Sequence, residues 1–108
     1  MDKDALNRRI SAGNFVENNG SVLRTINILK TKYNRLKNIR YALGNIEKTD
    51  IENSVNYLYE AGYLHLRHFE SHIETTLADT DFDMLEGKLT AKGIQLLVGV
   101  IEDECVEM

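Results

Sequence analysis

The stretch TDIENSVNYLYEAGYLHL, residues 49–66, constrains the fold of this chain more than any other part of the sequence. Ile51, Val55, Leu58 and Tyr59 recur at helical spacing, so one face of a helix here is apolar and suited to a core. Gly62 suits the left-handed residue that ends many helices, and the residues after it alternate in polarity as a strand does. The stretch therefore predicts a helix that stops at a glycine and turns directly into a strand.

The start of this predicted helix and its polar face are marked as well. Thr49 and Glu52 have the spacing of a capping box, in which each side chain accepts a hydrogen bond from the backbone N–H of the other residue. Asn53, Asn56 and Tyr57 fall away from the apolar stripe. We therefore expect a face that is free to contact a partner, and the chemistry of that partner is the functional question.

Composition indicates a soluble, globular protein of one domain. The chain has 108 residues, 43% of them hydrophobic and 28% charged, with no proline, and this length suffices for one core but not for two. No apolar run approaches membrane-spanning length, and the first residues lack the apolar core of a secretion signal, so we expect a cytoplasmic protein. The single cysteine, Cys105, cannot form an internal disulfide.

Charge is strongly segregated along the sequence, although the formal net charge is only −4. Residues 21–46 contain no Asp or Glu, and their basic residues are Arg24, Lys30, Lys32, Arg35, Lys37 and Arg40. The acids gather in residues 70–83 and in residues 102–108. Such segregation bears on partners rather than on fold. Two interpretations of the basic segment stay open, a nucleic-acid contact surface and a solvated helical surface.

Further elements are predicted on the N-terminal side. Residues 2–12 are expected to form a short helix that stops at Gly13, and the asparagine-rich residues 14–20 a connection. A stronger helical pattern covers residues 21–33, with Ser21 as its N-cap. The phase of the apolar positions then resets, which predicts a separate short helix that ends at a glycine before residue 49.

On the C-terminal side we expect a returning strand and a closing helix. Residues 84–89 are predicted to pair with residues 64–66, which makes a hairpin with a long acidic tip. Thr90 is predicted to cap the last helix, whose inward stripe would be Ile94, Leu97, Val98 and Ile101. Leu96 and Val100 fall on the other side, so this helix is expected to be buried or docked on another chain. We expect a homodimer through the terminal helices, at Leu6, Ile10, Leu96 and Val100.

Two motifs carry a resemblance to a known family. IENSVNYLYEAGYLHLR, residues 51–67, resembles a recognition helix that runs through an L-x-x-x-G-Y-L pattern into the first wing strand, and KLTAKGIQLLVG, residues 88–99, resembles the second wing strand and the start of the next helix. The chain resembles the winged helix-turn-helix family, and within it small single-domain prophage-type members. The resemblance extends over residues 21–101 and implies a mainly helical α+β fold, with residues 1–20 as an N-terminal helix or arm and residues 102–108 as an acidic tail.

The resemblance implies a phage-type transcriptional regulator that binds double-stranded DNA. In that family the recognition helix enters the major groove, so Asn53, Asn56 and Tyr57 would face base edges. Candidate phosphate contacts are Arg24, Lys30, Lys32, Arg35, Lys37, Arg40 and Arg67. The departure from the family pattern is that residues 49–61 contain no Lys or Arg and that the wing tip is acidic, and carboxylates near phosphate oppose binding.

The alternative is a winged-helix module that binds another protein through the polar face of residues 49–61 and does not bind DNA. No phosphate-cradling glycine loop, triad spacing or zinc signature appears, so we expect a non-enzyme without a cofactor or a metal. His65, His68 and His72 are close in sequence, but on a strand the first two point to opposite faces, and a surface role is the simpler interpretation.

Overall fold

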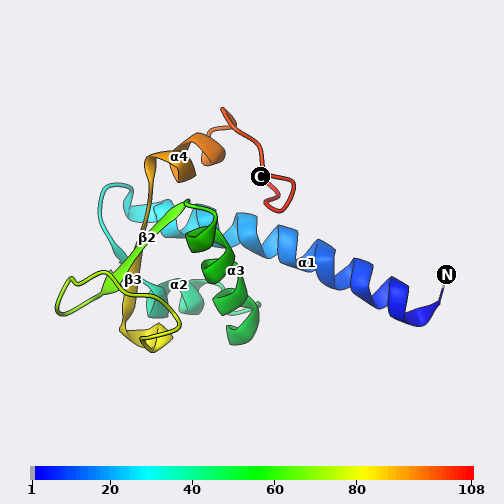
Figure 1. The fold of residues 1–108 in the computed structure, drawn as a ribbon, viewed down its shortest axis with the longest axis horizontal. Coiled ribbons are helices and arrows are strands. Elements are labelled where there is room, and N and C mark those ends of the chain that lie inside the picture. The colour runs from blue at the N-terminus through cyan, green and yellow to red at the C-terminus, as the bar shows by residue number, and fades with distance from the viewer. Residues whose placement is uncertain (1) are drawn as a thin grey trace.

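The structure is a computed structural model that describes residues 2–108, and it combines helices with a small antiparallel sheet. The helices in chain order are α1 (Lys3–Ile26), α2 (Leu36–Ala42), α3 (Lys48–Glu60) and α4 (Ala91–Leu97), and the strands are β1 (Asn34–Arg35), β2 (Leu64–His68) and β3 (Leu85–Leu89) (Figure 1). Short 3-10 turns form η1 (Asn27–Leu29) and η2 (Phe82–Met84). The expected α+β fold is confirmed at this level.

The sheet has the order β1-β3-β2, and both strand pairs are antiparallel. Leu64 lies opposite Leu89 and Leu66 opposite Gly87, so the predicted hairpin pairing is confirmed. On the other edge of β3, Asn34 also lies opposite Gly87. The sequence predicted two strands and missed β1, because a strand of two residues has no alternation to detect.

Helix α1 is one continuous helix, and three sequence predictions about it were wrong. It begins at Lys3, capped by the Asp2 carboxylate, and runs through Gly13 and residues 14–20 without a stop or a connection. Ser21 is therefore an interior residue and not an N-cap. Asn19 and Gly20 are fully buried in this stretch, so tertiary packing overrides the weak local helix propensity of its asparagines and glycines.

The same helix ends earlier than its apolar spacing predicted. The last α-helical residue is Ile26 rather than Tyr33. The side-chain amide of Asn34, itself buried, donates a hydrogen bond of 2.6 Å to the carbonyl oxygen of Ile26. This bond satisfies a carbonyl that the helix would otherwise leave open, and it turns the chain into β1.

The C-terminal end of α3 is the predicted glycine stop. Gly62 has φ +89°, and its N–H donates to the carbonyl oxygen of Tyr59 while the N–H of Tyr63 donates to that of Leu58, which is the Schellman arrangement. The N-terminal end differs from the prediction. The helix begins at Lys48, and Glu47 at the N-cap makes no side-chain capping bond, so the capping box predicted at Thr49 does not form.

The core lies between α1, α3 and the sheet. Its completely buried side chains include Val22, Leu23, Leu36, Ile51, Val55, Leu58 and Leu85. The predicted apolar stripe of α3 is thereby confirmed. Phe82 in η2 is also buried, so the end of the long loop between β2 and β3 packs against the body, whereas residues 70–74 of the loop are exposed.

Helix α4 is shorter and rotated relative to the prediction. Thr90 caps it as expected, since its hydroxyl accepts a hydrogen bond from the N–H of Gly93 at 3.1 Å. Leu96 is 1% exposed, whereas Ile94 and Val98 are 46% and 66% exposed, so the predicted inward stripe was wrong at these positions. Its other two members, Leu97 and Ile101, are partly buried against the core. The reason is Gly93, where a Cβ would overlap the carbonyl oxygen of Tyr63. This close approach fixes which side of α4 meets the core.

Beyond α4, the C-terminal segment, residues 98–108, turns back onto α1 (Figure 1). Val106 is buried in the core. The backbone N–H of Glu107 donates a hydrogen bond of 3.1 Å to the carbonyl oxygen of Val16. The side-chain amide of Asn19 donates one of 2.8 Å to the backbone carbonyl oxygen of Cys105. The N-terminal half of α1 instead extends away from the rest of the molecule (Figure 1).

Candidate functional site

The free face of α3 presents two amides to solvent. Asn53 and Asn56 are both exposed, one helical turn apart. Beside Asn53, a small depression is bordered by Asn14 and Asn18 of α1 and by Asp50. This surface can donate and accept hydrogen bonds, but no lysine or arginine borders the depression beside Asn53.

Tyr57, the third predicted base contact, is engaged within the chain. Its hydroxyl donates a hydrogen bond of 2.7 Å to Oδ2 of Asp103. Its ring meets the Phe15 ring edge-on, with centroids 5.5 Å apart and an interplanar angle of 78°. Reading a base with this hydroxyl would first require the loss of the bond to Asp103, so Asn53 and Asn56 are the more available side chains.

Asp103 joins two tyrosines through the same carboxylate oxygen. Tyr63 also donates to Oδ2, at 2.7 Å. Partial burial is the main cause that raises the pKa of both tyrosines, and the hydrogen bond to Asp103 is the second cause. Together they raise the pKa of Tyr63 to about 12. Burial would raise the pKa of Asp103 as well, but the hydrogen bonds from Tyr63, Tyr57 and the N–H of Cys105 outweigh burial, and the pKa is lowered.

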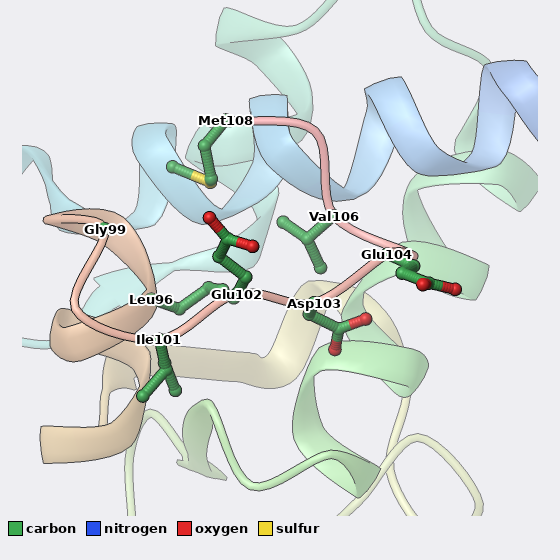
Figure 2. A pocket seen from close by; sticks show the side chains of 8 residues that line it. All are labelled: Leu96, Gly99, Ile101, Glu102, Asp103, Glu104, Val106 and Met108. Atoms are coloured by element: carbon green, nitrogen blue, oxygen red, sulfur yellow. The ribbon is translucent and has the colours of Figure 1, made fainter.

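Figure 2 shows how the C-terminal segment reaches this position. Leu96, Ile101, Val106 and Met108 border a cavity between α4 and the returning chain, while the Asp103 carboxylate points toward α3. The cavity is walled largely by the segment itself. The acidic residues 102–108, predicted as a tail, thus include side chains that hold the segment to the folded body.

Three of the seven predicted phosphate contacts are used inside the chain. The Arg35 guanidinium lies 3.7 Å from the centroid of the Phe69 ring and donates to the carbonyl oxygen of Asp83. Arg67 forms an ion pair with Glu86 and lies 3.6 Å above the Tyr33 ring. Arg24 donates to the backbone oxygen of Glu107 and to Ser21. These arginines fasten the loop, the sheet and the C-terminal segment.

The other four predicted phosphate contacts are exposed. Within residues 2–108, the side chains of Lys30, Lys32, Lys37 and Arg40 make no hydrogen bond or ion pair. Lys37 and Arg40 border an open depression on α2 beside Tyr41, which is 90% exposed, and Asp83 lies at its edge. This depression places two of these unpaired cations on the helix that precedes α3.

The acidic loop approaches that surface. Asp81 and Asp83 border a second depression together with Lys48 and Glu52 at the start of α3. The loop is shaped in part by His68, whose Nδ1 accepts a hydrogen bond from the N–H of Glu70 at 3.1 Å. Carboxylates therefore lie close to the same helices that carry the free cations.

The predicted dimer residues differ in their exposure to solvent. Leu6, Ile10 and Val100 are 49%, 53% and 73% exposed and are available to a second chain. Leu96 is not, because it is buried in the core of its own chain, and its assignment to a dimer interface was wrong.

Within residues 2–108, no three His, Cys, Asp or Glu side chains come together in a way that could hold a metal ion. None of the helices described has both the length and the apolar character needed to cross a membrane.

No family model matches this chain, and no curated protein or solved structure is significantly similar to it. The group that sequence reasoning missed is Asp103 with its two tyrosines. The available signal was the apolar Val106 among the acids of the C-terminal residues, which marks a segment with a buried side.

Proposed function

We propose that this chain is a winged-helix protein that binds double-stranded DNA, with α2 as the phosphate-contacting helix and α3 as the helix presented to base edges. The observation that carries the proposal is the pair Lys37 and Arg40, exposed on α2 and free of partners in the described chain. The element order, three helices followed by a hairpin and a closing helix, supports it by resemblance to that family.

In this proposal the two helices have separate tasks. Lys37 and Arg40 displace counterions from the phosphate backbone, which supplies affinity without sequence preference. Asn53 and Asn56 supply amides of the kind that pair bidentately with adenine in the major groove. Because the acids of the loop lower the affinity of this surface for phosphate, binding is expected to be weak at physiological salt and stronger at low salt.

The test compares two double charge reversals with equal changes in net charge. Lys37→Glu with Arg40→Glu alters α2, and Arg8→Glu with Arg9→Glu alters the N-terminal half of α1. We expect the α2 variant to bind a labelled duplex at least tenfold more weakly and to reduce the slope of log K against log salt by about 2. The α1 variant should lose much less affinity for the duplex. No binding by the original chain at micromolar concentration and low salt would sink the proposal.

A second candidate is a protein-interaction module that uses the free face of α3. It is favoured by the charges around Asn53 and Asn56, since Asp50 and Glu60 are exposed and Glu52 is half-buried on the same helix. This candidate predicts indifference to DNA at low salt. It also predicts a protein partner that is lost on Asn56→Arg and retained by the α2 charge reversal, the opposite outcome to that expected for DNA binding.

A further inference from the structure

An apolar groove lies between the turn after η1 and helix α4. Its apolar side chains are Leu89, Ile94, Leu97 and Val98, and two lysines, Lys30 and Lys88, stand along it. We call this surface the α4 groove. None of the residues that line it belongs to α2 or α3, so it is separate from the surfaces discussed above.

The groove exposes apolar side chains that a folded chain normally hides. Ile94 and Val98 are 46% and 66% exposed, and Ile28 and Leu29 in the adjoining turn are 66% and 50% exposed. Contiguous apolar surface with a polar rim marks a site of interaction on soluble proteins. Ile94 and Val98 lie one helical turn apart, a spacing that can contact the apolar side of another helix.

The charge around the groove selects among possible occupants. Lys30, Lys88 and His65 line it together with neutral residues, and it has no acidic lining residue, in a chain whose formal net charge is −4. A second copy that presented the same groove would bring lysines against lysines, which is unfavourable. An occupant with carboxylates beside an aliphatic stripe would instead complement both the rim and the floor.

The backbone at Lys30 gives an independent argument. Lys30 has φ 53° and ψ −89°, in a turn closed by a hydrogen bond from the N–H of Lys32 to the carbonyl oxygen of Leu29. This is the first central position of a reverse turn that favours glycine, and a lysine there is strained. Strained backbone is concentrated where a side chain must be held in a particular place. Here the strained residue carries a cation on the edge of the α4 groove.

We propose that the α4 groove binds an acidic amphipathic helix of another protein, with Ile94 and Val98 contacting its aliphatic stripe and Lys30 and Lys88 pairing with its flanking carboxylates. The helix-in-groove mode supplies affinity through the buried apolar side chains, and the charges set its orientation and exclude basic helices. The proposal does not depend on DNA binding through Lys37 and Arg40 of α2, and it gives Lys30, a candidate phosphate contact in the sequence, a different role.

The probe is a fluorescent synthetic peptide that is designed to be helical, with leucines at i, i+4 and i+7 and glutamates beside them. A second peptide carries lysines in place of the glutamates. We expect micromolar binding of the acidic peptide to the full chain and at least tenfold weaker binding of the basic one. Val98→Glu should reduce binding of the acidic peptide at least tenfold, whereas Val100→Glu, an equally exposed position outside the groove, should leave it unchanged.

Lys30→Gly provides a second measurement, which separates a role of Lys30 in peptide binding from a purely structural role. It should weaken acidic peptide binding about threefold, as for the loss of one exposed charge pair, and at the same time raise Tm by about 4 to 8 °C through relief of strain. Lys32→Ala, which removes a charge from the same turn but outside the groove, should do neither. Equal binding of the two peptides, no binding of either, or a homodimer that Val98→Glu dissociates would each overturn the proposal.

Discussion

The hydroxyl of Tyr57 donates a 2.7 Å hydrogen bond to the carboxylate of Asp103, which lies 46 residues further along the chain. Tyr63 donates to the same oxygen. One carboxylate thus ties α3 and the residue that enters β2 to the C-terminal segment. Because the segment also buries Val106, it is an integral part of the folded unit on the side of α3 that faces α1.

This cluster predicts a dependence of stability on pH at both ends of the scale. The pKa of Asp103 is lowered on folding, so its contribution is complete above the ordinary value of 3.8 and is lost as pH falls through the folded pKa. The pKa values of both tyrosines are raised, so their contribution is complete below 10.0 and is lost as pH rises through the folded values. Thermal unfolding should therefore show a plateau of Tm between these limits, with a decline on either side.

Asp103→Asn should reduce the free energy of unfolding at pH 7 by about 1–2 kcal/mol, because hydrogen bonds to a charged acceptor are stronger than those to an amide. It should also remove most of the decline in Tm at acidic pH that the original chain shows. Denaturant titrations at pH 7 and at pH 3 check both statements. Glu104→Gln, an exposed neighbouring carboxylate, is the control, and an equal effect there would show that general charge and not this contact is responsible.

Two glycines of α1 should respond in opposite directions to alanine. At Gly20 a Cβ would overlap the carbonyl oxygen of Glu107, whereas at Gly13 it would meet nothing within 4 Å. Gly20→Ala should destabilise the chain by about 1–3 kcal/mol and make the C-terminal segment more sensitive to protease. Gly13→Ala should stabilise it by about 0.5–1 kcal/mol, as expected in an exposed helix. Similar Tm values for the two variants would contradict the close approach of the segment.

Arg67 is predicted to act in stability rather than in DNA binding. Arg67→Met leaves Glu86, which is 8% exposed, without its cation and should cost about 1–3 kcal/mol. Glu86→Gln in the same background should recover part of the loss, because it removes the unpaired charge. If Arg67→Met instead kept its Tm and weakened DNA binding, Arg67 would be a phosphate contact as the sequence suggested.

We expect self-association to use the N-terminal half of α1. Leu6 and Ile10 lie one helical turn apart and are about half exposed, and this half of α1 extends away from the body (Figure 1). We expect a dimer in sedimentation experiments that becomes a monomer on Leu6→Asp with Ile10→Asp. A monomer of the original chain at high concentration would remove the dimer prediction altogether.

The elements that the sequence predicted correctly are those with strong local signals. The stripe of α3, the glycine stop at Gly62, the cap at Thr90 and the pairing of β2 with β3 each depend on residues close together in the chain or on a simple period of two or of 3.6. The errors fall where distant contacts compete with local propensity. The capping box predicted at Thr49 does not form, because the helix already begins at Lys48. The N-cap residue is Glu47, and its side chain makes no capping hydrogen bond.

The candidate site shows the same division. Composition alone identified the basic residues 21–46, but it did not distinguish Lys37 and Arg40, which stay free, from Arg35, which stacks on an aromatic ring. Arg67, predicted as a phosphate contact outside this segment, stacks on a ring as well. Arginine is suited to both phosphate contacts and aromatic stacking, and only the position of an aromatic ring decides between them. The same holds for Tyr57, whose engagement depends on an aspartate far along the chain.

By itself, the amino-acid sequence determined which face of α3 is buried, where α3 stops at Gly62 and which segments pair as β2 and β3, because periodicity and glycine stops are local properties. Tertiary structure decided that α1 is continuous, that α4 turns Leu96 inward, and that the C-terminal residues bind back to Val16 and Asn19. Each of these depends on a close approach between backbone segments distant in sequence. Such contacts leave only faint local marks, such as an asparagine or a glycine where the helix pattern does not require one.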